Sequence, residues 1–117
     1  MRRGRQILLL AVALLLAASA ALAQEAPLRR FGLFIGANDG GSDRVRLRWA
    51  VADAERVADV MTEIGGVSQQ DAYLLEDPTA RDILWQFEHL KGRIGSAADN
   101  ARRTELVVYY SGHSDES

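Results

Sequence analysis

One histidine in the sequence stands where an α/β protein could use it for chemistry. His113 follows an apolar run at residues 106–110, from which Ser111 and Gly112 separate it. Such a run is typical of a buried parallel strand, and the sites of open α/β sheets lie at the carboxyl ends of their strands. An imidazole there can act as a general acid or base near neutral pH. The plainer interpretation is a solvent-facing histidine in a loop.

The sequence contains no cysteine, so His113 has no thiol partner within it. We therefore interpret the chain as the leading part of an enzyme whose nucleophile lies beyond Ser117. Disulfides and thiolate zinc sites are excluded as well, and two histidines make a poor metal cage. We expect neither a metal nor a cofactor.

Other polar residues offer weaker candidates for a site. Asp39 follows the first predicted strand and could line a substrate pocket, although Asn, Asp and Gly more often simply form turns. Arg46 and Arg48 are interpreted as a solvated helix start, and His89 as a surface residue. The stretch at residues 36–41 lacks the lysine of a phosphate loop. The GxSxG motif of serine hydrolases is absent too.

The amino terminus has the layout of a secretory signal peptide at residues 1–23. Three arginines precede an apolar run that ends in a small-x-small pattern, which predicts cleavage between Ala23 and Gln24. The alternative is an uncleaved membrane anchor. Cleavage would take the formal net charge from −2 to −5, because three arginines are lost. We expect a periplasmic or secreted protein that does not bind nucleic acid, which needs a basic face.

The rest of the sequence alternates between short strands and amphipathic helices. After a polar lead-in at residues 24–30, strands are predicted at residues 31–36, 72–75 and 104–110, and helices at 47–64 and 79–94. This alternation predicts an α/β fold of three parallel strands with right-handed crossover helices. If the first strand lies between the other two, the helices cover opposite faces of the sheet.

Local signals mark the ends and buried faces of these helices. Gly65 and Gly66 predict a left-handed end for the first helix. Thr79 and Asp82 form an acidic variant of the capping box at the start of the second. The apolar stripe of the second helix is predicted to comprise Ile83, Leu84, Phe87, Leu90 and Ile94. The aromatic residues expected to be buried in the core or partly buried are Trp49, Trp85, Tyr109 and Tyr110.

Three segments together resemble the caspase-like cysteine peptidases, the group that contains caspases and metacaspases (peptidase C14-type). Residues 107–116, VVYYSGHSDE, resemble the histidine motif of that family. Residues 30–39, RFGLFIGAND, are similar to its first strand, and residues 47–66 to its first helix. The resemblance implies that residues 31–117 are the N-terminal part of a caspase-like catalytic domain, a partial three-layer sandwich.

The resemblance also implies a mechanism and a polypeptide substrate. The family's cysteine, at the end of a fourth strand that this sequence does not reach, attacks the peptide carbonyl. His113 would protonate the leaving amine, and the backbone amide of Ser114 would help to hold the oxyanion. Many relatives have glycine where this sequence has Ser114.

Two alternatives remain open at this stage. The parent protein could be a catalytically degenerate caspase-like module that binds or scaffolds. A flavodoxin-like ligand-binding domain would explain the alternation of strands and helices, but not the SGHS segment at residues 111–114.

Overall fold

The computed structural model of the 117-residue chain describes residues 2–22 and 27–114. Its elements in chain order are α1 (Arg2–Leu22), β1 (Leu28–Gly36), α2 (Ala50–Glu63), β2 (Val67–Glu76), α3 (Ala80–Ala97) and β3 (Arg103–Ser111). The strands and the two later helices alternate along the chain. This order is the one that a parallel sheet with crossover helices requires.

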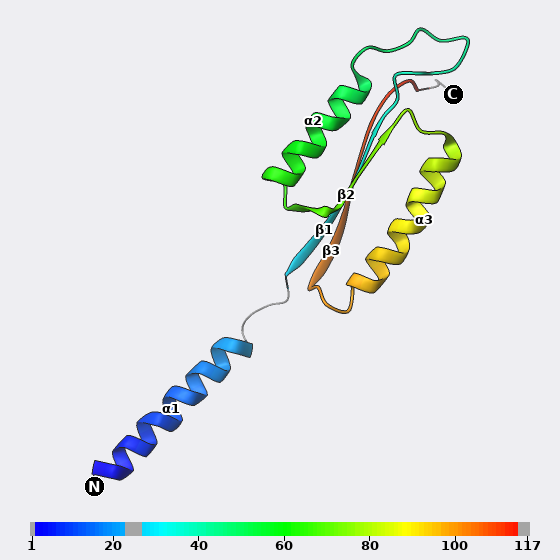
Figure 1. The fold of residues 1–117 in the computed structure, drawn as a ribbon. Helices are drawn as coiled ribbons and strands as arrows, with labels where there is room; N and C mark the ends of the chain where they lie inside the picture. The colour runs from blue at the N-terminus through cyan, green and yellow to red at the C-terminus, as the bar shows by residue number, and fades with distance from the viewer. Residues whose placement is uncertain (1, 23–26, 115–117) are drawn as a thin grey trace.

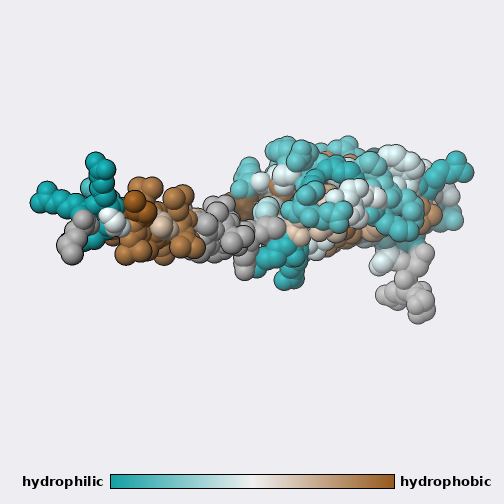
Figure 2. All heavy atoms as spheres, turned by 90° about the horizontal axis from the view of Figure 1, so that it is seen from below, coloured by the Kyte–Doolittle hydropathy of each residue, from teal (hydrophilic) through white to brown (hydrophobic). Residues whose placement is uncertain are grey.

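The segment predicted as a signal peptide forms helix α1. The side chains of residues 2–17 are all exposed, so this part of α1 does not pack on the sheet. Figure 2 shows apolar side chains along the helix and polar ones at its start. Among the described residues, no helix is long and apolar enough to cross a membrane. The predicted cleavage position after Ala23 lies outside the described residues.

The three strands form one parallel sheet in the order β2-β1-β3. Helices α2 and α3 lie on opposite sides of this sheet (Figure 1). The prediction of an α/β fold with three parallel strands and crossover helices is therefore confirmed. Because all strands run the same way, their carboxyl ends meet at one edge, and β1 brings its own end between the other two.

The central strand β1 is buried on both faces. Phe31, Leu33 and Ile35 point to one face, where Leu90 of α3 completes the cluster. Phe34 is also fully buried and points to the other face of the strand, where Gly36, two residues later, lies against the backbone of α2. Side chains alternate between the faces of a strand, and a strand covered on both faces is apolar throughout. The apolar run in β1 therefore reflects its central place.

Helix α2 begins against the carboxyl end of β1. A Cβ atom on Gly36 would overlap the backbone of Val51, so glycine allows this close approach. Trp49, the residue before the helix, provides no side-chain cap. The Asn38 side chain takes this role instead, and its Oδ1 accepts the Val51 amide at 3.1 Å. The helix therefore starts three residues later than expected. The Leu47 amide bonds to the Asn38 carbonyl instead of entering the helix.

The predicted glycine end of α2 and the predicted capping box of α3 are confirmed, whereas α3 continues to Ala97 instead of ending near residue 94. The Asp82 amide donates to Thr79 Oγ1 at 3.2 Å, and the Thr79 amide donates to Asp82 Oδ2 at 2.8 Å. The backbone hydrogen bond from Thr79 lowers the pKa of Asp82. Gly65 donates to the Val60 carbonyl after α2, and Gly66 adopts a φ of 75°.

A buried carboxylate ties β1, β2 and α3 together towards the amino-terminal edge of the sheet. Asp71, only 2% exposed, accepts two hydrogen bonds of 2.9 Å from Arg29 and one of 2.8 Å from Arg93. Ser68 donates to it as well, at 3.1 Å. The hydrogen bonds from Arg29, with that from Ser68, outweigh burial and lower the pKa of Asp71. Burial of this charge is tolerated because every partner is polar or cationic.

Several expectations about boundaries and burial are wrong. Strand β1 begins at Leu28, so residues 28–30 are not a lead-in. Trp49, Trp85 and Tyr110 are 59%, 65% and 49% exposed rather than buried, whereas Tyr109 is partly buried. Leu84, from the predicted apolar stripe of α3, is 67% exposed, and Phe87 is 38% exposed. The reason is geometric, since α3 turns its buried face, with Ile83, Leu90 and Ile94, towards β1 and β2.

Candidate active site

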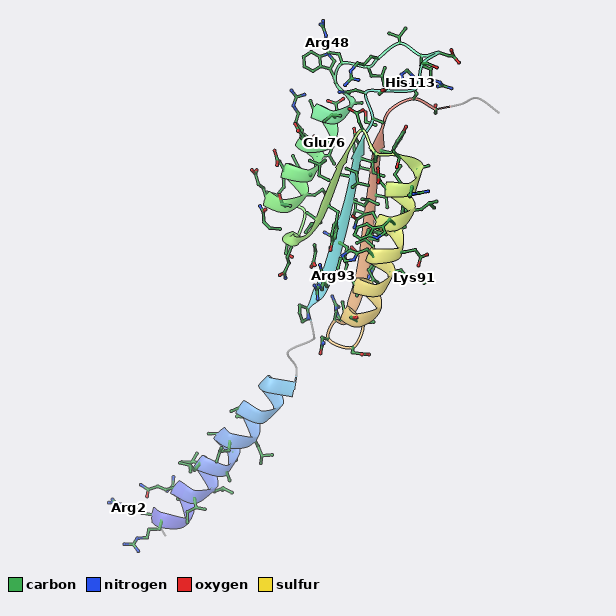
Figure 3. The ribbon with its side chains drawn as sticks, turned by 45° about the vertical axis from the view of Figure 1, so that its right-hand side comes forward. Arg2, Arg48, Glu76, Lys91, Arg93 and His113 are labelled. Atoms are coloured by element: carbon green, nitrogen blue, oxygen red, sulfur yellow. The ribbon has the colours of Figure 1, made fainter. Side chains whose placement is uncertain are left out.

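The carboxyl ends of the strands surround a small cavity that contains the predicted histidine. Its volume is about 240 Å³. The cavity is lined by Ala37, Asp39, Gly40, Arg44, Pro78, Ile83, Tyr110 and His113. These residues come from the end of β3 and the turn after it, from the β1–α2 loop (residues 37–49), from the turn after β2 and from the start of α3. Figure 3 shows His113 at this edge of the sheet, whereas Arg93 of α3 lies towards the opposite edge.

The His113 ring is held by the β1–α2 loop. Its Nε2 lies 2.8 Å from the carbonyl oxygen of Val45. A carbonyl oxygen only accepts hydrogen bonds, so Nε2 carries the proton and, in the neutral ring, Nδ1 keeps its lone pair. The ring also packs so closely on Gly40 that a Cβ atom at residue 40 would overlap it. The geometry thus selects one tautomer, with Nδ1 as the basic atom.

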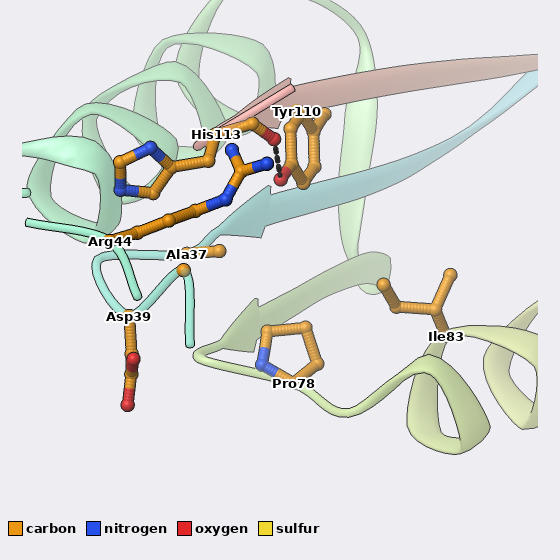
Figure 4. A pocket seen from close by; sticks show the side chains of 8 residues that line it. Ala37, Asp39, Arg44, Pro78, Ile83, Tyr110 and His113 are labelled. Carbon is orange, nitrogen blue, oxygen red and sulfur yellow. Dashed lines mark hydrogen bonds between the residues drawn. The ribbon is translucent and has the colours of Figure 1, made fainter. Parts of the chain in front are cut away.

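A second contact fixes the turn on which His113 is carried. The Tyr110 hydroxyl donates to the His113 carbonyl oxygen at 2.8 Å, as the dashed line in Figure 4 shows. Ahead of this turn, the Ala37 amide donates to the Ser111 carbonyl at 2.9 Å, which extends the pairing of β1 and β3. The partly exposed ring of Tyr110 therefore holds the turn and also forms one wall of the cavity.

Arg44 lies beside the histidine in the cavity (Figure 4). Its Nη1 donates to the carbonyl oxygen of Ser114 at 3.4 Å. Ser114, whose amide the resemblance assigns to an oxyanion site, is exposed directly after His113. The guanidinium group places a positive charge at the cavity, where a developing negative charge would be stabilised. Sequence reasoning did not single out Arg44, because nothing in its spacing distinguishes it from its arginine neighbours.

Asp39 combines the two interpretations that the sequence left open. It lines the cavity, and its Oδ1 also accepts the Gly41 amide at 3.0 Å, as in a turn. Its side chain is 63% exposed and lies 4.0 Å from Arg46. Arg48 lies outside the cavity lining, with its guanidinium over the Trp49 ring.

One residue at this edge was missed by sequence reasoning altogether. Asp77, directly after β2, accepts the amides of Asn38 and Asp39 on Oδ1 at 2.7 and 3.0 Å. Its own amide donates to the Gly36 carbonyl at 2.8 Å. Its φ is 45°, a left-handed conformation that few residues other than glycine adopt. The available signal was an aspartate before proline at the end of a strand, which marks a structured turn.

The second histidine does not belong to this site. His89 is exposed on α3, where its ring stacks on Trp85 at a centroid distance of 5.3 Å. Its prediction as a surface residue is confirmed. Within residues 2–22 and 27–114, no group of three or more histidine or carboxylate side chains could hold a metal ion.

The arrangement provides a general base or acid at the rim of a polar cavity. Nδ1 of His113 can accept a proton from a nucleophile, and Arg44 and the adjacent backbone can stabilise negative charge.

A scan of the chain against protein-family models, a search of curated proteins and a search of solved structures each found no match.

Proposed function

We propose that the chain is the histidine-bearing part of an exported caspase-like cysteine endopeptidase. The thiol is supplied by a strand outside this sequence, and His113 is its acid and base. The observation that carries the proposal is the hydrogen bond from His113 Nε2 to the Val45 carbonyl. It holds the ring at the carboxyl end of β3 and leaves Nδ1 for proton transfer.

The proposed reaction needs one proton carrier. The cysteine proton moves to Nδ1, and the thiolate forms a bond to the peptide carbonyl carbon. When the C–N bond breaks, the imidazolium returns that proton to the leaving amine. Water then cleaves the thioester with the imidazole again as base. The Val45 carbonyl stabilises the imidazolium, since its oxygen accepts a hydrogen bond from the Nε2–H group throughout.

The first test is the coding sequence that follows Ser117. The proposal expects a fourth strand ending in Asp-x-Cys within a few tens of residues. A continuation with that cysteine replaced would reject the peptidase and support a degenerate scaffold. The 117-residue chain alone should neither react with a thiol alkylator nor cleave peptides that contain Arg, Lys or Asp. Cleavage by the pure chain would contradict the proposal.

The second test uses the parent protein and its two histidines. His113→Asn should lower kcat for peptide cleavage by at least about 100-fold, because general acid–base catalysis contributes 10²–10⁴-fold. His89→Asn is the matched control, since His89 is exposed on α3 outside the cavity lining, and should leave kcat unchanged. Equal activities of the two variants would remove His113 from the mechanism.

A further inference from the structure

We propose that Asp77 is a positioning residue for His113 and acts through the β1–α2 loop. The inference rests on the proposed function, because it assigns a new residue to the same site. Asp77 follows β2, and His113 follows β3, on the other side of β1. We therefore infer that the Asp77 carboxylate acts on the His113 ring through the β1–α2 loop, which contacts both residues.

The Asp77 carboxylate organises the first residues of that loop. Its Oδ1 accepts two consecutive backbone amides, those of Asn38 and Asp39. Consecutive amides that converge on one oxygen form a cradle for negative charge. The Asp77 amide donates back to Gly36 at the end of β1. One residue thus fixes both the last residue of the strand and the first residues of the loop.

The loop transmits this order to the imidazole. The Asn38 carbonyl accepts the Leu47 amide at 2.7 Å and closes the segment between them. That closed segment contains both groups of the loop that hold the ring, namely Gly40 and the carbonyl of Val45. Loss of the anchor at Asn38 would let both groups shift. His113 Nε2 would then lose its fixed acceptor.

The backbone of Asp77 supports a dedicated role. Its φ of 45° costs energy for any residue with a Cβ atom, although Asp and Asn tolerate it best. The following Pro78 restricts the same backbone further. Such strain persists where surrounding contacts hold it, and it is concentrated at functional sites. Here the contacts are the three hydrogen bonds of Asp77 and the Arg46 guanidinium, 3.6 Å from Oδ2.

Two substitutions separate the acceptor from the backbone strain. Asp77→Gly adopts the left-handed conformation without strain but removes the acceptor. Asp77→Asn keeps an acceptor oxygen and tolerates the same φ. If Asp77→Gly does not fold, Asp77→Ser replaces it, because its shorter hydroxyl cannot reach both amides.

The readout is the tautomer of His113 in the full chain, measured by long-range ¹H–¹⁵N spectra at a pH where the ring is neutral. His89→Gln assigns the signals, because the chain has two histidines. We expect wild type and Asp77→Asn to show protonated Nε2 and bare Nδ1. In Asp77→Gly both ¹⁵N shifts should move towards the average of the two tautomers.

A second carboxylate provides the control for a purely structural role. Asp82 also accepts a backbone amide, at the start of α3. Asp82→Ala should lower the unfolding temperature and leave the His113 shifts unchanged. If Asp77→Gly likewise lowers only the unfolding temperature, the positioning role is wrong.

Activity of the parent protein gives an independent arm. We expect Asp77→Gly to lower kcat by about 10- to 100-fold with KM within about twofold, as misplacement of a catalytic group does. Asp77→Asn should retain most of the rate. A tautomer change in a parent without peptidase activity would overturn the proposed function and leave the positioning role standing. If the parent cleaves peptides but Asp77→Gly leaves the His113 shifts unchanged, the positioning role is wrong and the proposed function stands.

Discussion

The His113 ring takes its orientation mainly from backbone groups. Nε2 meets a carbonyl at Val45, the ring face meets Gly40, and the turn is fixed by Tyr110 through the His113 carbonyl. Backbone contacts can be provided by many side-chain sequences. The site is therefore more sensitive to the path of the loop than to most residue types within it.

A methyl group at residue 40 tests this arrangement. We expect Gly40→Ala to displace the His113 ring, because the new Cβ atom would overlap it. The hydrogen bond to Val45 should be lost, and the ¹⁵N shifts of His113 should change accordingly. Gly41 is unsuitable as a control because its φ is 101°, whereas Gly95 on α3 has open space around it. Wild-type His113 shifts in Gly40→Ala would show that the ring is held in another way.

The elements are joined by charged contacts as well as by the apolar core. The Asp71 carboxylate links β1, β2 and α3 through Arg29 and Arg93, and both guanidinium groups lie near the Phe31 ring. This cluster lies away from the His113 cavity. We interpret it as the structural anchor that holds α3 on the sheet while the opposite edge carries the site.

Asp71 should make the stability of the chain depend on pH. Its pKa is lower in the folded state than the value of about 3.9 in the unfolded state, so the unfolded state binds more protons in acid. The stabilisation is complete above about pH 5 and is lost as the pH falls through the folded pKa. We expect Asp71→Asn to cost about 2 kcal/mol at pH 7, because the charge-assisted hydrogen bonds from two partly exposed arginines are lost. Urea titrations at pH 7 and pH 3 check both statements, and an equal loss at the two values would contradict them.

Replacement of one glycine in α3 should increase the stability of the chain. Gly95 is exposed inside the helix, and a Cβ atom there would meet nothing within 4 Å. Alanine favours the helix over glycine by about 1 kcal/mol. Gly95→Ala should therefore raise the free energy of unfolding by about that amount, as measured in urea. No change, or a decrease, would mean that this turn of α3 is frayed or makes other contacts.

At the scale of the whole molecule, the β3 edge of the sheet carries an exposed apolar stripe. Strand β3 pairs only with β1 among the described strands, and its side chains Leu106, Val108 and Tyr110 are 38%, 48% and 49% exposed. The exposed Leu84 and Phe87 belong to the neighbouring helix α3. An edge strand with apolar side chains is prone to pair with other chains. We expect poor solubility of residues 24–117 expressed alone.

A charged side chain on the β3 edge should reduce its pairing with other chains. Val108→Lys places an ammonium group in the middle of the exposed stripe and should raise the soluble fraction and the proportion of monomer. Gln69→Lys is the charge-matched control, because Gln69 is an exposed polar residue of β2. Light scattering and size-exclusion chromatography measure both variants. Equal solubility of the two would show that net charge matters and the β3 edge does not.

The order of the elements and the position of His113 could be predicted from the sequence by itself. Both depend on local signals, namely apolar runs, helical periodicity and the capping pair Thr79 and Asp82, which act over a few residues. The start of β1 could not be predicted in the same way. Residues 28–30 looked like lead-in sequence because the polar side chains of Arg29 and Arg30 are compatible with either a strand end or a loop.

Only the tertiary structure decided what surrounds the histidine. Val45 offers a backbone carbonyl, which every residue possesses, so no residue type marks it in advance. Asp77 is 36 positions from His113 along the chain, and β1 lies between their strands. Hydrogen bonds between distant segments depend on strand order and loop path, which local patterns do not encode. The sequence therefore determined which residue can supply an imidazole at this edge of the sheet, and the fold determined which nitrogen of its ring is left without a backbone partner.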